Sequence, residues 1–319
     1  MSNSGRKVNY SLRPAKNVER KMMCEFFREA NKMYKINQYR YIGFGAFYFT
    51  DFTLMHKEFN INKMVSIEKD QTNSARFEFN KPFGCIELCF GESTIMLESQ
   101  LNWDYNTKDI VWLDYDDILT ESKIFDFELC INKVTSGSFV IISFNSTLNE
   151  KNEGGRLKDL SNNCGESRIP VGTRETNLDT IESYKVFQKI IFNSVEKALV
   201  EKNSKYIEEC DKYIAKQIMF FKYKDNAPML TLGYTIIKNS DLIKYGQCSY
   251  ESIEFFSSSN EPYRIDVPNF TYKELQAINK NLPSETFDDI ALEMPFINKN
   301  DINKYCKIYR YFPNYMEIS

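Results

Sequence analysis

The chain of 319 residues has a single histidine, His56, and its eight cysteines are scattered without a CxxC pair. A structural zinc site usually needs two close pairs of ligands, so this distribution disfavours zinc. A Cys-His nucleophile is formally open, but nothing in the sequence brings a cysteine to His56. We therefore expect reduced thiols and no bound metal.

The sequence also lacks a long apolar run and a large net charge. No uninterrupted apolar stretch approaches the roughly 18 residues that cross a bilayer, and the start has no apolar secretory leader. The formal net charge is only -3, which gives no global electrostatic argument for a nucleic-acid partner. These absences favour a soluble, cytoplasmic protein that does not associate with membranes.

What the chain does contain is a series of short apolar runs separated by helical stretches. The runs are residues 39–44, 64–67, 86–90, 110–113 and 139–142. Parallel strands buried on both faces are continuously apolar, and right-handed crossovers place helices on both faces of the sheet. Residues 218–237 contain two further runs around a polar turn, which is typical of an antiparallel hairpin. The pattern predicts an α/β fold with a doubly wound, mainly parallel, Rossmann-like sheet closed by an antiparallel hairpin.

The pattern divides the chain into three expected parts. The parts are an N-terminal helical lead (1–39), an α/β domain (40–238) that contains a polar, mobile loop (147–176), and a C-terminal α+β accessory module (239–319). In the lead, apolar residues recur at helical spacing while Arg20 and Lys21 occupy the other side, so this helix should pack against the main domain.

A glycine turn follows the first predicted strand. Gly43 and Gly45 would let the backbone approach a ligand closely at the start of a helix. The dinucleotide fingerprint needs a third glycine where this chain has Tyr48, so NAD or FAD is disfavoured. Glu68 ends the second strand, where a carboxylate could accept both hydroxyl hydrogens of a ribose. The alternative for Glu68 is an ordinary solvated strand end.

Polar residues also follow the third and fourth strands. Glu92 and Ser93 come after the third strand, and Asp114 and Asp116 end the fourth. Open α/β sheets bind ligands at the carboxyl ends of their strands. Carboxylates gathered there repel one another unless they meet a cation, a basic ligand or hydrogen-bond donors. A charged loop exposed to water is the alternative.

The succession YIGFGAF, SIEKD, FGES and DIVWLDYDD resembles class I S-adenosylmethionine-dependent methyltransferases, nearest to the small O-methyltransferase group. The resemblance covers about residues 40–146. It implies S-adenosylmethionine (SAM) as cofactor and methyl transfer to an unidentified acceptor, with oxygen as the candidate acceptor atom. The Asn/Asp-Pro-Pro-aromatic loop of base-modifying DNA methyltransferases is not present after the fourth strand, which disfavours methylation of a flipped base.

The resemblance also implies roles for individual residues. Asp114 would lie in the methyl-transfer pocket, where Asp114 or Asp116 would act as a base or position the acceptor. The implied cofactor-binding residues are Gly43 and Gly45 for the methionine part, Glu68 for the ribose, and Glu92 and Ser93 for the adenine.

The chain departs from the family pattern at several positions. Tyr41 stands where an acid usually precedes the glycine turn, and Phe47 stands where a third glycine is common. In cation-dependent members, the fourth-strand aspartate and a later Asp-Asn pair hold magnesium. Asp114 and Asn145 match those ligands here, but Phe144 replaces the other aspartate, so we predict no metal.

These departures support a rival hypothesis, a catalytically inactive relative that acts as a binding or scaffold subunit. Such a subunit could bind a protein partner or nucleic acid through its basic N-terminal segment and the aromatic, basic residues 305–312. The basic residues are Arg13, Lys16, Arg20 and Lys21. For residues 305–312, sealing of the core is the favoured alternative. A nucleotide-dependent enzyme is disfavoured because the Walker lysine pattern is missing.

Overall fold

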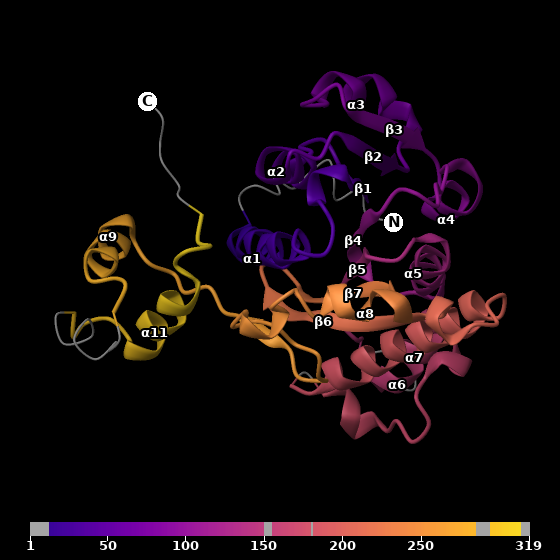
Figure 1. Ribbon diagram of the computed structural model, residues 1–319. Coiled ribbons are helices and arrows are strands. Elements are labelled where there is room, and N and C mark those ends of the chain that lie inside the picture. Colours follow the sequence, from indigo (N-terminus) through magenta and orange to yellow (C-terminus); the bar gives the residue numbers. More distant parts are fainter. Residues whose placement is uncertain (1–12, 150–154, 180, 285–293, 314–319) are drawn as a thin grey trace.

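The computed structural model describes residues 13–149, 155–179, 181–284 and 294–313. Its strands form a single eight-stranded sheet. The strands are β1 (Arg40–Gly43), β2 (Lys63–Glu68), β3 (Ile86–Phe90), β4 (Asp109–Ile118), β5 (Ser138–Asn145), β6 (Tyr213–Lys224), β7 (Pro228–Lys238) and β8 (Tyr263–Ile265). Their order across the sheet is β3-β2-β1-β4-β5-β7-β6-β8 (Figure 1).

The sheet is mainly parallel, as the continuous apolar runs predict. β1 to β5 pair in parallel, and β7 is inserted antiparallel between β5 and β6. β6 therefore runs in the same direction as β5, and β8 extends the edge in parallel with β6. The predicted fold class, a Rossmann-like sheet closed by an antiparallel hairpin, is confirmed. All the strand ends that carry the predicted site point to one edge of the sheet.

Helices cover both faces of the sheet and bury two separate apolar clusters. One face is covered by α1 (Pro14–Ala30), α2 (Thr50–Phe59) and α3 (Ser74–Asn80), and the other by α5 (Glu121–Lys133), α6 (Gly155–Cys164) and α7 (Ser183–Asn203). The described residues also form α4 (Ser93–Ile95), α8 (Leu242–Tyr245), α9 (Tyr272–Lys280) and α11 (Lys299–Ile308). None of the helices within the described residues is long and apolar enough to span a membrane.

The predicted lead helix is α1, and it is fixed to the main domain by a cap from a distant turn. Pro14 begins the helix, and the backbone N–H groups of Ala15 and Lys16 each donate to Asp225, at 3.1 Å. Asp225 lies in the turn between β6 and β7, so the start of α1 is held at the carboxyl edge of the sheet. The prediction that Arg20 lies on the outer side is wrong, because its side chain is only 3% exposed.

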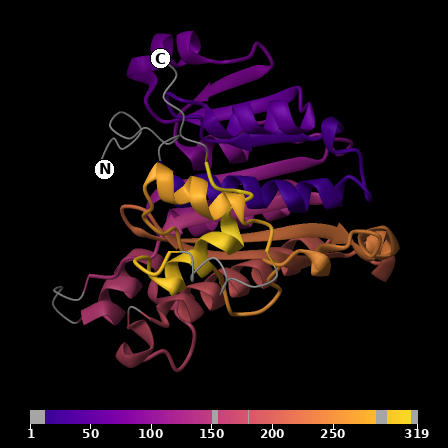
Figure 2. The same cartoon turned by 90° about the vertical axis from the view of Figure 1, so that its left-hand side faces the viewer.

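The C-terminal region does not separate from the sheet at residue 239. β8 pairs with β6, and Tyr250 and Phe255 pack in the same cluster as α1. Among the described residues, α9 and α11 build a small cluster of their own, and they lie to one side of the sheet (Figures 1 and 2). Tyr311 packs edge-on against Phe255 at 5.6 Å between ring centroids. The closing aromatic residues thus seal the core, the favoured alternative.

The polar segment 147–176 contains a helix that the sequence did not indicate. α6 buries Leu160 and Cys164 against the cluster beneath α5 and α7. The sequence pattern did not predict this helix because few of its residues are apolar. Two buried apolar residues one turn apart, Leu160 and Cys164, suffice to pack its ten residues against the sheet. Residues 150–154 of the segment lie outside the described residues.

Candidate functional site

A cavity of about 650 Å³ lies at the carboxyl ends of β1 to β4. Of the residues singled out from the sequence, its lining includes Glu68, Glu92, Ser93, Asp114 and Asp116. The carboxyl ends of neighbouring parallel strands meet at one edge, so residues distant in sequence converge there. The structure therefore brings these five side chains together around a single space.

Gly43 and Gly45 are required by the packing of the chain itself. A Cβ on Gly43 would lie 2.8 Å from the Tyr41 hydroxyl oxygen, and a Cβ on Gly45 would lie 2.5 Å from the Phe49 ring. Side-chain carbons do not approach so closely without a shift of the neighbouring atoms. The cavity lining includes neither glycine, so their contact with a methionine group stays a prediction.

Replacing Gly45 by alanine should destabilise the fold by about 1–3 kcal/mol, because the new methyl group overpacks the turn against Phe49 and Ser66. Gly84→Ala is the matched control, since a Cβ there meets nothing within 4 Å. Urea denaturation of both variants measures the difference. Equal stability of the two would contradict the packing argument.

Tyr41 and Phe47, the departures beside the glycine turn, do not fill the cavity. The Tyr41 ring packs edge-on against Phe52 at 4.9 Å, and Phe47 packs against Phe77 at 4.5 Å. Both side chains are buried in the cluster under α1 and α2, and neither belongs to the cavity lining. They complete the core and leave the space at the strand ends open.

Glu68 closes the glycine turn with one carboxylate oxygen. Its Oε1 accepts from the Gly45 N–H at 2.8 Å, the Ala46 N–H at 3.1 Å and the Ser66 hydroxyl at 2.7 Å. Burial raises the pKa of Glu68 to about 7, although these three hydrogen bonds lower it. Oε2 receives no hydrogen bond from the described residues, while Glu68 lines the cavity. One oxygen thus holds the turn and the other stays available to a ligand.

Asp126 of α5, a buried acid, holds the side chains that line the cavity after β3 and within β4. It accepts hydrogen bonds from the hydroxyls of Ser93 at 2.5 Å and Tyr115 at 2.7 Å. The Tyr115 ring lies 5.1 Å from the Phe44 ring, so two aromatic residues flank the space. Glu92 is 57% exposed at the rim and pairs with Lys69. Ser93 is therefore fixed, whereas Glu92 remains a solvated rim group.

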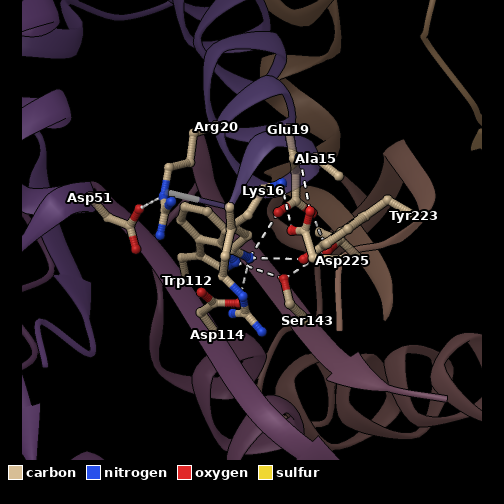
Figure 3. A network of polar contacts seen from close by, with 12 residues as sticks. Ala15, Lys16, Glu19, Arg20, Asp51, Trp112, Asp114, Ser143, Tyr223 and Asp225 are labelled. Atoms are coloured by element: carbon tan, nitrogen blue, oxygen red, sulfur yellow. Dashed lines mark hydrogen bonds and ion pairs between the residues drawn. The ribbon is translucent and has the colours of Figure 1, made fainter. Parts of the chain in front are cut away.

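Asp114 forms a buried ion pair with Lys16 of α1 (Figure 3). The Lys16 ammonium lies 2.6 Å from Asp114 Oδ1, 2.8 Å from Glu19 Oε2 and 3.1 Å from the Tyr223 hydroxyl. It also lies 4.4 Å from the centre of the Trp112 ring. Burial alone would lower the pKa of Lys16, but the carboxylates of Asp114 and Glu19 raise it well above its ordinary value. Lys16 is therefore a cation beneath the cavity and cannot act as a base.

The other basic residues of the N-terminal segment also turn inward. Arg13 pairs with Asp116 at 3.3 Å, and the buried Arg20 pairs with Asp51 of α2 (Figure 3). Lys21 donates to the Phe312 carbonyl at 3.4 Å. Arg13, Lys16 and Arg20 thus neutralise carboxylates of the same chain, so these three ion pairs give no support to the alternative in which they bind nucleic acid.

The two residues that match magnesium ligands are both engaged by the protein. Asn145 Oδ1 accepts from the Thr147 N–H at 2.9 Å and the Thr147 hydroxyl at 2.7 Å, and Asp114 Oδ1 is held by Lys16. Phe144, which replaces the third ligand, is buried in the core. Within the described residues, no three histidine, cysteine, aspartate or glutamate side chains group in a way that could hold a metal ion.

The fold does bring one cysteine to the histidine, which the sequence did not indicate. Cys85 Sγ lies 3.8 Å from His56 Nδ1, and the same nitrogen lies 3.0 Å from the Ile61 carbonyl oxygen. A carbonyl oxygen only accepts, so Nδ1 carries the proton and cannot take one from the thiol. The His56 ring also stacks on Phe83 at 4.2 Å. This pair is part of the packing and is not an activated nucleophile.

Three residues of the site had no sequence motif that could reveal their roles. Lys16, Asp126 and Asp225 each contact a residue that is distant in the sequence. For Lys16 and Asp126, the available signal was a charged residue at a helix position that faces the sheet, which the apolar periodicity alone does not show. Asp225 lies in the turn between β6 and β7, where no local pattern indicates a contact with α1.

The strand order, the reversed β7 and the cavity at the carboxyl ends of β1 to β4 define a Rossmann-like fold of the class I methyltransferase type. The sequence profile of the family described as "Putative O-methyltransferase" matches residues 8–319. The chain belongs to that family, and the resemblance seen in its motifs is confirmed.

The chain also shows distant similarity to solved structures of other proteins. The chain is similar to an O-methyltransferase from Bacillus cereus in complex with SAH, with 11% identity, coverage of 73% of this chain and 86% of the other, and a TM-score of 0.37. It is also similar to the O-methyltransferase TomG from Streptomyces achromogenes in complex with SAM, with 11% identity, coverage of 66% and 79%, and a TM-score of 0.35. No curated protein matches the chain. The assignment therefore rests on the family match and the strand order.

Proposed function

We propose that the protein is a SAM-dependent methyltransferase that binds its cofactor in the 650 Å³ cavity and methylates an oxygen atom of its acceptor. The observation that carries this proposal is the convergence of Glu68, Ser93 and Asp114 on one space, in a chain that belongs to an O-methyltransferase family. Bound SAM supplies an electrophilic methyl group on its sulfonium. The residues of the chain bind and orient the two reactants.

The cavity residues fit the adenosine part of the cofactor. Glu68 lines the cavity at the end of β2. Its Oε2 can accept the two ribose hydroxyl hydrogens, since Oε1 is already used by the glycine turn. Phe44 and Tyr115 offer aromatic faces for the adenine ring. Ser93 begins α4 in a position fixed by Asp126. Glu92 contributes a carboxylate at the rim.

Asp114 is the residue we assign to the acceptor. Lys16 holds its Oδ1, and Oδ2 receives no hydrogen bond from the described residues while the side chain lines the cavity. Oδ2 can therefore accept the hydrogen bond of an acceptor hydroxyl and take up its proton as the oxygen attacks the methyl group. The Lys16 cation keeps Asp114 in place. Asp116 also lines the cavity and pairs with Arg13 at 3.3 Å, and we assign it to positioning of the acceptor.

Isothermal titration of the full chain with SAM and with its demethylated product S-adenosylhomocysteine (SAH) tests the proposal. We expect one site with a dissociation constant of about 1–100 μM, a range typical of binding energies near 6 to 8 kcal/mol. NAD, which shares the adenosine moiety, serves as the control ligand and should bind much more weakly. Absence of a signal with SAM and SAH at millimolar concentration would contradict cofactor binding.

A further inference from the structure

A second cavity, of about 340 Å³, lies at the same edge of the sheet beyond β5. It is formed by the residues after β5, the end of β6, the start of β7, β8 and the first turn of α7. Its charged lining residues are Arg156, Lys222, Lys224, Arg264, Asp179 and Asp266. Four cations against two carboxylates make this space positive in a chain whose net charge is -3.

Two of the cations are neighbours on adjacent strands. Lys222 of β6 is the register partner of Arg264 of β8, and like charges directly opposite each other in a sheet are destabilising. Burial lowers the pKa of Lys222, and the Arg264 guanidinium lowers it further. The chain offsets part of this repulsion through the carboxylates of Asp179 and Asp266, whose charges raise the pKa of Lys222, and through the Ile181 carbonyl oxygen, 3.1 Å from the Lys222 ammonium. An anion between the two cations would relieve the rest.

The first turn of α7 adds to the same potential. Ser183 and Tyr184 line the cavity at the start of this 21-residue helix, where the helix dipole favours negative charge. Asp179 already accepts hydrogen bonds from the Ile181, Glu182 and Ser183 N–H groups at this end. The start of α7, the register-matched pair Lys222 and Arg264, and the side chains of Arg156 and Lys224 thus surround one space that is open to solvent on one side.

The second cavity is linked to Asp114 by a chain of hydrogen bonds. Tyr223 lines this cavity, its hydroxyl accepts from the Lys16 ammonium, and Lys16 also donates to Asp114 of the first cavity (Figure 3). The two spaces therefore lie on either side of the Lys16 cluster.

We propose that the second cavity binds an anionic group, a carboxylate or a phosphate, of the methyl acceptor. This inference rests on the proposed function, because it assigns a charge class to the acceptor of that reaction. Lys222 and Arg264 bind the anion, and the acceptor's hydroxyl lies toward Asp114. An acceptor without an anionic group would gain no binding energy from this cavity.

Titration of the full chain with inorganic phosphate and with acetate tests the anion site directly. We expect saturable binding with a dissociation constant of about 1–10 mM for at least one of the two probes. Binding should be at least about tenfold weaker in the double variant Lys222→Gln, Arg264→Gln, because this variant lacks both charged donors. Lys216→Gln is the matched control, because Lys216 is an exposed residue of the same strand outside the cavity.

Parallel titration with SAH separates this inference from the proposed function. SAH should bind equally to the wild type, the double variant and Lys216→Gln. Unchanged SAH binding without saturable binding of either anion overturns the inference and leaves the proposed function standing. Anion binding without SAH binding overturns the link to a methyl acceptor. If the double variant does not fold, Arg264→Gln and Arg264→Lys at the edge strand give the same test, with the lysine variant expected to retain binding.

Discussion

Lys16→Met should destabilise the protein by about 3–5 kcal/mol, the usual cost of breaking a buried charge cluster by removing one partner. Lys16 is 1% exposed and neutralises Asp114 and Glu19, which are 10% and 0% exposed. Without the ammonium, these carboxylates face each other in a nonpolar environment beside Trp112. The free energy of unfolding in urea measures the loss.

Lys32→Met is the matched control for this variant. Lys32 lies in the turn just after the same helix and pairs with Glu29 at 2.6 Å with the same three-residue separation, but its side chain is 47% exposed. An exposed pair of this kind contributes about 0–1 kcal/mol. Adding Asp114→Asn to Lys16→Met should recover part of the stability because it removes one unpaired charge. Equal stability of the Lys16 and Lys32 variants would disprove the cluster as a stabilising unit.

The sheet and the residues at its carboxyl edge could be predicted because both follow from short, local stretches of sequence. A run such as Val111–Trp112–Leu113 is apolar at every position, which only a strand buried on both faces tolerates. The chain direction then places the residue after each run, including Glu68 and Asp114, at the carboxyl edge. Local pattern and topology together suffice to gather these residues around one cavity.

The contacts that set the chemistry of the site could not be predicted in this way. The Lys16 and Asp114 side chains are 98 residues apart in sequence, and helical periodicity assigns charged residues such as Arg20 to the solvent side. Buried cations become stable only when carboxylates from distant elements meet them, which is a property of the folded structure. The same reason explains why Asp126 was not recognised as the acid that holds Ser93 and Tyr115.

Glu68→Gln should change stability and cofactor binding in opposite directions. The carboxyl of Glu68 has its pKa raised by burial from 4.5 to about 7, so the folded state holds its proton more tightly than the unfolded state. The stability contributed by this group is present below the unfolded pKa and is lost as the pH rises through about 7. This loss amounts to about 3 kcal/mol at pH 8. The amide does not ionise, so the variant should be more stable than the wild type at pH 8 and similar to it at pH 5.

Glu68→Gln should weaken SAH binding at pH 8, although it stabilises the fold at this pH. The glutamine oxygen can still accept from the Gly45 and Ala46 N–H groups, but its NH₂ then faces the cavity and cannot accept the ribose hydroxyl hydrogens. We expect SAH affinity at pH 8 to fall by roughly 10- to 100-fold, as the loss of hydrogen bonds to a charged group implies. Wild-type affinity should itself increase as the pH rises through about 7. Glu92→Gln, on the solvated rim, should leave the pH dependence of stability unchanged. If Glu68→Gln gains stability at pH 8 and still binds SAH as the wild type does, Glu68 serves only the glycine turn and the ribose assignment is wrong.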